Sequence, residues 1–116
     1  MEWELDIDSL VKDMLGRKSY NDALDIDENS IELNSTNKSI YGTIYRYYVY
    51  ASSYYYDYNV TSIRTDGKEV TGYGCTCREF NMRRSCKHIA AVILNNFEEF
   101  YPKPLTIEEI TKNLLD

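Results

Sequence analysis

Four residues constrain this chain most, because they are its only cysteine and histidine side chains. Cys75, Cys77, Cys86 and His88 lie within fourteen residues, in the spacing C-x-C-x8-C-x-H. Three thiolates and one imidazole are the donor set that a closed tetrahedral zinc site requires. We therefore predict one structural Zn²⁺ ion, with sulfur ligands at about 2.3 Å and the nitrogen ligand at about 2.0–2.1 Å.

The spacing of these residues also predicts the local structure that carries them. Side chains at i and i+2 leave the same face of a strand, but they do not face each other on a helix. We therefore expect Cys75 and Cys77 at the end of a strand. Cys86 should lie in a non-helical segment, and His88 in the first turn of the helix that follows.

Other uses of the cysteines fit the sequence less well. A free core cysteine usually lies in apolar sequence, whereas these three have glycine, hydroxyl and basic neighbours. Their odd number and the lack of a signal peptide disfavour a disulfide framework. A zinc ion with four protein ligands has no position for water, so we expect no catalytic residues and no enzyme activity.

The length of 116 residues predicts one domain over residues 1–116. Within it we expect the zinc motif at 75–88 and a linker or helix at 102–116 that leads to further sequence. No run of eighteen apolar residues is present, so we expect no membrane contact. Thiols kept for a metal suit a reducing compartment, which predicts a cytoplasmic protein.

Charge is unevenly distributed along the chain. The net charge is −6, and residues 1–34 carry ten acids and three bases, or −7. Four bases surround the second half of the zinc motif, which makes them candidate nucleic-acid contacts: Arg78, Arg83, Arg84 and Lys87. Alternatively, these bases offset a Cys3His zinc site, whose formal charge is −1. The acidic remainder argues against general binding of polyanions.

Hydrophobic patterning predicts an antiparallel meander of three or four strands. Residues 29–35 alternate, and residues 40–50 and 54–64 are rich in β-branched and aromatic side chains. Asp66-Gly67 is typical of a two-residue hairpin turn, after which residues 69–76 return as a strand that ends in the first two cysteines.

Helices are expected on both sides of the meander. Residues 9–15 form a short amphipathic pattern with Ser9 as the N-cap. Residues 88–100 are apolar almost all round in their first half, which predicts a buried helix. Thr106 and Glu109 form a capping box for a last helix. The predicted fold class is α+β: a β-meander ending in a Cys3His zinc knuckle packed against the following α-helix, with short flanking helices.

Tyrosine is concentrated in the predicted strands. Nine of the twelve tyrosines lie between residues 41 and 58. Strand propensity and core filling account for most of them. Consecutive tyrosines must nevertheless point to both faces of a sheet, so some rings face solvent or a partner. Such rings suit base stacking and protein contacts equally.

The motif and the apolar residues that follow it (CKHIAAVIL) resemble the SWIM zinc finger, whose pattern is C-x-C, a variable gap, and C-x-H opening a helix. The resemblance implies that Cys75, Cys77, Cys86 and His88 are zinc ligands, and that Ile89–Val92 begin a packing helix. SWIM modules occur in helicases, transposases and ubiquitin-related signalling proteins. The resemblance therefore implies a module that binds DNA or protein.

Upstream sequence is similar to the N-terminal region of bacterial SWI/SNF-type helicases. The similar stretches are LGRKSY and SIYGTIYRYYVYASS, although this chain has Ser52-Ser53 where such proteins often have Gly-Ser. The resemblance implies an accessory N-terminal domain that contacts DNA or regulates the motor, in a nucleoid-associated protein. No G-x-x-x-x-G-K-[ST] loop occurs, so any ATPase lies outside these residues.

Two alternatives remain open at this stage. The first is a protein–protein adaptor with a purely structural zinc, using the tyrosine-rich sheet or the acidic N-terminal region. The second is a redox protein in which three cysteines and one histidine hold an iron–sulfur cluster. The second fits less well, because the CDGSH-type proteins place histidine further beyond the third cysteine than Cys86-Lys87-His88 does.

Overall fold

The computed structural model describes residues 6–51 and 54–102. Helices precede and follow a block of four strands. The elements are α1 (Ile7–Leu15), α2 (Arg17–Ala23), the 3₁₀ turn η1 (Glu28–Ser30), β1 (Ile31–Ser39), β2 (Gly42–Ala51), β3 (Tyr54–Thr65), β4 (Val70–Cys75), α3 (Arg78–Arg83), α4 (Lys87–Asn95) and α5 (Phe97–Phe100).

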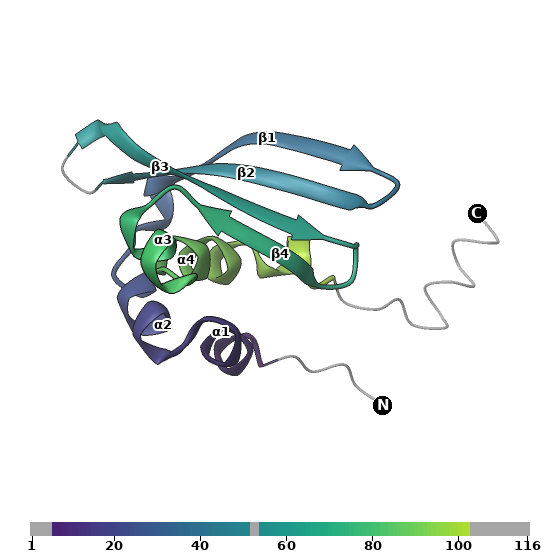
Figure 1. The fold of residues 1–116 in the computed structure, drawn as a ribbon, viewed down its shortest axis with the longest axis horizontal. Helices are drawn as coiled ribbons and strands as arrows, with labels where there is room; N and C mark the ends of the chain where they lie inside the picture. The colour runs from purple at the N-terminus through teal and green to yellow at the C-terminus, as the bar shows by residue number, and fades with distance from the viewer. Residues whose placement is uncertain (1–5, 52–53, 103–116) are drawn as a thin grey trace.

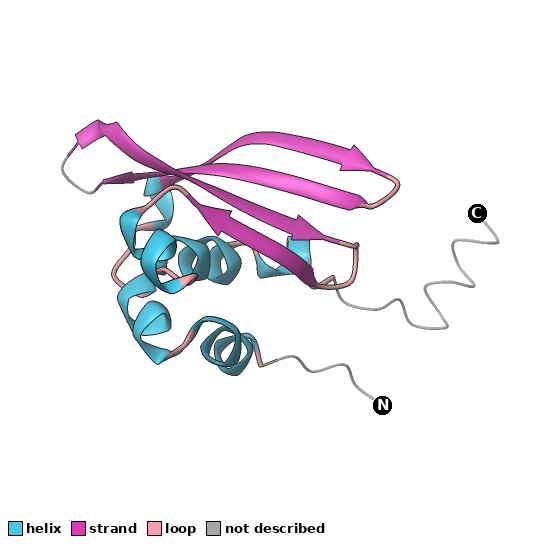
Figure 2. Ribbon diagram, viewed as in Figure 1, coloured by secondary structure: helices cyan, strands magenta, loops and turns pink. Residues whose placement is uncertain are grey.

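The four strands form one antiparallel sheet in the order β1-β2-β3-β4. Each strand pairs with its neighbour in sequence, so the predicted meander and the α+β fold class are confirmed. Helices α3, α4 and α5 lie on one face of this sheet, and α1 and α2 pack beyond α4 (Figure 1, Figure 2). No described helix covers the opposite face, which we call the open face.

The core lies between the sheet and α4. Five consecutive residues at the centre of α4 are completely buried: Ile89, Ala90, Ala91, Val92 and Ile93. A helix that is apolar all round must be enclosed on every side, and α4 is enclosed by the sheet on one side and by α1 and α2 on the other. Burial of each large aliphatic side chain stabilises the fold by about 1.5–3 kcal/mol.

Strand alternation divides the tyrosines between the two faces. Tyr47 is buried under the helices, and the rings of Tyr45 and Tyr47 meet Phe100 edge-on, with centroids 5.4 and 6.3 Å apart. These two tyrosines therefore fill the core, as strand propensity and core filling predict. Phe100 is completely buried by the contact.

Other tyrosines gather on the open face. The ring of Tyr58 lies 4.4 Å from that of Tyr48 and 5.7 Å from that of Tyr50. The Tyr50 hydroxyl donates to Glu32 at 2.9 Å. These three rings form a joined aromatic patch, so the tyrosine-rich segment serves both the core and the surface.

The predicted N-cap of the first helix is wrong. The cap is Asp6, whose carboxylate accepts the backbone N–H of Ser9 at 3.1 Å, and the helix begins at Ile7. Ser9 lies in the first turn and donates its hydroxyl to Asp6 at 2.8 Å. Both residues are good caps, and the carboxylate can accept two hydrogen bonds at once.

The single helix predicted over residues 88–100 is also wrong. The chain forms α4 and α5 with a break at Asn96. The side-chain amides of Asn95 and Asn96 donate to the carbonyl oxygens of Ala91 and Val92, at 2.7 and 3.0 Å. Such bonds compete with the backbone for the same acceptors and favour an end to the helix.

The hairpin predicted at Asp66-Gly67 is confirmed, but its loop has four residues, 66–69, instead of two. The Asp66 carboxylate accepts the backbone N–H groups of Lys68 and Glu69 at 2.8 and 3.0 Å. Gly67 adopts a φ of +96°, which a glycine tolerates without strain. The side-chain bonds therefore stabilise a wider turn than the dipeptide alone predicts.

Some elements were not anticipated from the sequence. These elements are α2, η1 and α3. The strand β1 was predicted to end at residue 35, but it extends four residues further, to Ser39. The helix expected from the capping box at Thr106 and Glu109 lies outside the described residues. Within the described part of the chain, every helix lacks the length or the apolar character needed to cross a membrane.

Candidate metal centre

Three elements converge to bring the four motif residues together. Cys75 is the last residue of β4, Cys77 is the N-cap of α3, and Cys86 is the N-cap of α4. His88 lies in the first turn of α4. The predicted positions of Cys86 and His88 are confirmed. Cys77 lies just past the strand, in extended backbone with φ −71° and ψ 157°.

The four donor atoms of the cluster all lie within 4.8 Å of one another, and no other such group occurs in the described part of the chain. Cys75 Sγ and His88 Nδ1 are 3.7 Å apart. Tetrahedral zinc–sulfur and zinc–nitrogen bonds would place these atoms about 3.6 Å apart. All three cysteines are free thiols. The group is therefore positioned to bind one zinc ion.

Burial of the cluster suits a structural metal. Cys86 is completely buried and Cys77 is 8 % exposed, whereas Cys75 and His88 are half-buried. Four donors that enclose one point leave no open coordination position, which distinguishes a structural zinc site from a catalytic one.

Hydrogen-bond donors surround the sulfur atoms. The hydroxyl of the fully buried Thr61 lies 3.4 Å from Cys75 Sγ, and the Phe80 backbone N–H donates to Cys77 Sγ at 3.3 Å. Such contacts orient ligands and tune their basicity. Sequence patterns did not reveal Thr61, because its position opposite Cys75 depends on a register shift between β3 and β4.

Contacts between the three thiols shift their pKa values strongly. Hydrogen bonds, first from Cys86 and then from His88 and Thr61, lower the pKa of the Cys75 thiol to about 3. The same contact with Cys75, together with burial, raises the pKa of Cys86 far above its usual range, and burial raises the pKa of Cys77. In the absence of a metal ion, the protein therefore favours the thiolate form of Cys75 only. A divalent cation offsets the repulsion that opposes the other two.

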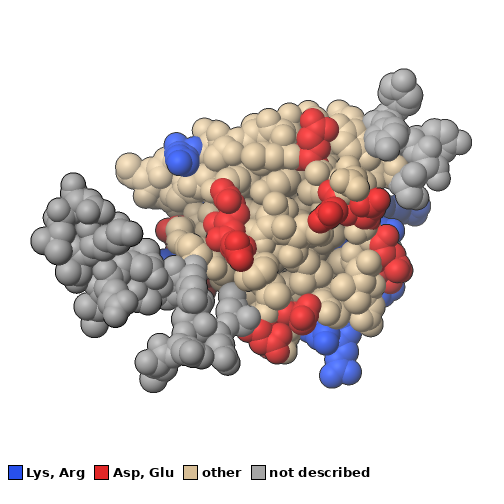
Figure 3. Space-filling model, turned by 180° about the vertical axis from the view of Figure 1, so that it is seen from behind, with Lys and Arg blue, Asp and Glu red and all other residues tan. Residues whose placement is uncertain are grey.

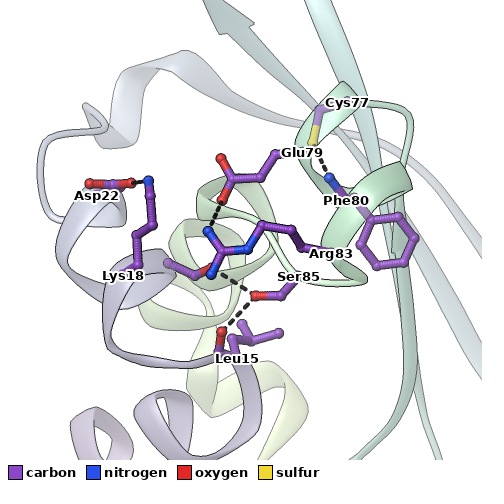
Figure 4. Close-up of polar contacts among 9 residues, drawn as sticks. Leu15, Lys18, Asp22, Cys77, Glu79, Phe80, Arg83 and Ser85 are labelled. Carbon is purple, nitrogen blue, oxygen red and sulfur yellow. Dashed lines mark hydrogen bonds and ion pairs between the residues drawn. The ribbon is translucent and has the colours of Figure 1, made fainter.

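Hydroxyl groups next to the cluster connect it to the N-terminal helices. Ser85 donates to the carbonyl oxygen of Leu15 at 2.6 Å, and its hydroxyl lies 2.7 Å from that of the buried Ser19 (Figure 4). These bonds join α1 and α2 to the loop between α3 and α4. The metal centre thus lies where α3 and α4 meet the end of the sheet, and the adjacent loop connects it to α1 and α2.

The four bases proposed to contact nucleic acid are all exposed and lie on α3, at its C-cap and at the start of α4. Arg83 turns toward Glu79, with Nη1 and Oε1 3.9 Å apart, next to the 2.7 Å pair of Lys18 and Asp22 on α2 (Figure 4). Arg84 adopts a left-handed conformation, with φ 60° and ψ 24°.

The bases form a small positive area on an acidic molecule. Arg83 has a loose partner, but the described residues offer no ion pair to Arg78, Arg84 or Lys87. Asp and Glu side chains are spread over the face seen in Figure 3, and Lys and Arg lie at its margins. Acidic side chains nevertheless lie close to the bases, since Glu79 approaches Arg83 and Asp22 pairs with Lys18 on the neighbouring helix α2.

The fold and the cluster define a zinc-binding α+β module with a Cys3His centre. Residues 63–96 match the family model of the SWIM zinc finger, which is the resemblance that the motif predicts. The match runs from the end of β3 through β4 and α3 to the end of α4, and so it contains all four donor residues. No curated protein and no solved structure gives a significant match to this chain.

Proposed function

We propose that Cys75, Cys77, Cys86 and His88 bind one structural zinc ion, and that the chain is an accessory binding module that contacts DNA. The convergence of the four donor atoms within 4.8 Å supports the zinc assignment. The match over residues 63–96, which contain these four residues, also supports it. The whole chain, residues 1–116, is proposed to act as a single module.

The parent protein is proposed to be a SWI/SNF-type DNA helicase whose motor lies outside these residues. This part of the proposal depends on the sequence resemblance upstream of the motif, because the family match covers the zinc finger alone. The module would then present DNA to the motor or regulate the activity of the motor.

The proposed DNA contact is the basic segment, defined as Arg78, Arg83, Arg84 and Lys87. The observation that carries this proposal is the exposure of all four side chains around one metal centre. Zinc would fix the start of α3 and of α4 through Cys77 and Cys86, so the bases would be held in a constant arrangement. Contacts of this kind bind phosphate without reading sequence.

Salt dependence of DNA affinity tests the proposal. Three phosphate contacts predict a slope near −3 in a plot of log K against log salt concentration. Replacing Arg78 with Ala and Arg84 with Gly should flatten the slope by about 2, because two contacts are lost. The affinity of the intact chain should be weak, with a dissociation constant of about 10⁻⁴–10⁻⁶ M, because the rest of the surface repels DNA.

A charge-matched variant provides the control. Lys38 and Lys68 are exposed on β1 and in the loop after β3, away from the metal centre. Replacing both with Ala removes the same charge but should leave the slope almost unchanged. Equal effects of the two double variants, or tight sequence-specific binding, would contradict the proposal. Zinc content should be the same in all three proteins.

The second candidate function is a protein–protein adaptor. The aromatic patch of Tyr48, Tyr50 and Tyr58 on the open face favours it, since tyrosine is enriched at protein interfaces. In that case DNA binding is already weak in the intact chain, and changes in the basic segment have little effect. Protein binding would instead be lost when Tyr58, which is 45 % exposed, is replaced with Ala.

A further inference from the structure

A large hollow opens beside the metal centre, at the start of α4. Its volume is about 660 Å³, within the range of ligand-binding pockets. The turn after α2 and η1 form one wall, and the end of β2 and the first half of β3 form the other. The start of α4, with Lys87 and His88, closes one end.

Negative charge dominates the lining of this hollow. Four carboxylates and a single ammonium group line it: Asp22, Asp25, Asp27, Asp57 and Lys87. Asp22 is already paired with Lys18 at 2.7 Å, and Asp27 accepts the backbone N–H of Asn29 at 2.9 Å. The carboxylates of Asp25 and Asp57 have no hydrogen bond or ion pair with any other described residue, and the two residues come from opposite walls.

The arrangement of the carboxylates does not suit a metal ion. Among the described residues, only the cysteine and histidine cluster brings three or more ligand atoms close enough to hold one. The aspartates are instead distributed along the hollow. Phosphate is excluded by the sign of the charge. A spread of carboxylates matches a ligand that carries separated positive charges.

Uncharged residues of the lining indicate a peptide. Ile26, Val49 and Ala51 contribute apolar surface, and Asn29 and Asn59 contribute amides that can both donate and accept hydrogen bonds. A small polycation would leave the apolar surface and the amides unused, whereas a peptide backbone and side chains would use both.

We propose that this hollow binds a basic segment of a partner protein, with arginine or lysine side chains directed at Asp25 and Asp57. The proposal goes beyond DNA contact by the basic segment, because it depends on the carboxylates of Asp25 and Asp57, although Lys87 of the basic segment also lines the hollow. A chain that binds phosphate through the basic segment and a basic peptide in the hollow would link DNA to a protein.

The test uses the zinc-loaded full chain and a defined probe, the acetylated peptide Ala-Arg-Ala-Arg-Ala-Gly. Its matched control replaces both arginines with citrulline, which keeps the shape and removes the charge. Backbone amide NMR shifts should move at residues 25–29 and 57–59 with the arginine peptide. They should move at least tenfold less, at equal concentration, with the citrulline peptide.

A pair of charge-matched variants locates the site. Asp25→Asn with Asp57→Asn should weaken binding of the arginine peptide about tenfold, because two facing carboxylates are lost. Asp13→Asn with Glu98→Gln removes the same charge from exposed positions outside the hollow and should weaken binding less than about twofold. Zinc content and thermal midpoint establish that both variants fold.

Several outcomes would overturn the proposal. They are equal binding of the two peptides, equal weakening by the two double variants, and shifts confined to the open face of the sheet. Absence of binding at millimolar peptide would do the same. Spermine that competes as strongly as the peptide would assign the hollow to a small polycation instead.

If either double variant fails to fold, the comparison of the two peptides on the unmodified chain still tests peptide binding. Titration with DNA tests the proposed DNA contact separately.

Discussion

At the scale of single residues, the environment of each sulfur atom decides how the metal centre works. Cys75 has the buried Thr61 hydroxyl at 3.4 Å, and Cys77 has the Phe80 backbone N–H at 3.3 Å. The backbone donor is present with every residue type except proline, whereas the hydroxyl can be removed by a side-chain substitution that keeps the same shape. Thr61 is thus the position where the influence of a supporting hydrogen bond on zinc affinity can be measured.

We expect Thr61→Val to weaken zinc binding about 10–100-fold while the protein still folds, because loss of such a supporting contact has that typical effect. Competition with a chromophoric chelator measures the affinity. Thr65→Val is the matched control, since Thr65 is buried in the same strand but its hydroxyl serves the loop at Gly67 and Glu69. It should lower stability and leave zinc affinity unchanged. An unchanged affinity in Thr61→Val would show that the hydroxyl is not coupled to the metal.

At the scale of elements, the short helix α3 depends on its ends. A six-residue helix has little intrinsic stability, and α3 begins at Cys77 in the metal cluster. It ends at Arg84 in the left-handed conformation, with the Arg84 N–H bonded to the Phe80 carbonyl oxygen at 2.7 Å. Glycine is the usual residue at such an end, so the arginine there costs conformational energy.

We expect Arg84→Gly to raise the free energy of unfolding by about 0.5–1 kcal/mol. Relief of the left-handed strain, about 1–2 kcal/mol, exceeds the added flexibility of the unfolded chain, about 0.4–1 kcal/mol. Chemical denaturation of the zinc-loaded protein measures the difference. Arg84→Ala is the control, because it removes the same side chain but keeps the strain. If Arg84→Gly is no more stable than Arg84→Ala, the strain of the left-handed conformation does not exceed the added flexibility of the unfolded chain, and the prediction is wrong.

The sequence predicted some of the elements around the metal centre but not α3. Alternation and β propensity predicted the strands, because the sheet buries one face of each. The i, i+2 spacing correctly placed Cys86 before a helix and His88 in its first turn. The helix α3 itself was not predicted. Its stabilisation comes from the metal cluster and from packing of Phe80 near Tyr73, with ring centroids 6.4 Å apart, and neither is a local property.

At the scale of the whole molecule, the metal centre joins the sheet to the helical layer. Its donors come from the end of β4 and the starts of α3 and α4. The adjacent Ser85 bonds to Leu15 and Ser19, which extends the connection to α1 and α2. The β2–β3 hairpin, in contrast, is held by its own backbone ladder.

We expect Cys86→Ser to abolish zinc binding and to lower the thermal midpoint by about 10–20 °C, equivalent to about 3 kcal/mol in a domain of this size. Amide hydrogen exchange should increase most in α4 and least in β2 and β3. A chelator should reproduce these changes in the unmodified protein and have no further effect on the variant. A midpoint equal to that of the zinc-loaded protein would mean that zinc does not stabilise the fold.

The sequence by itself determined the donor set, the meander and the burial of α4, because residue type and periodicity are local properties that the chain carries directly. Tertiary structure alone decided where helix 88–100 breaks, which hydroxyl approaches Cys75, and which acidic residues meet. Asp25 and Asp57 are 32 residues apart in the chain, and they line one hollow only because the sheet and the helices fold together beside the metal centre. Such contacts depend on register and packing between distant segments, which no local pattern specifies.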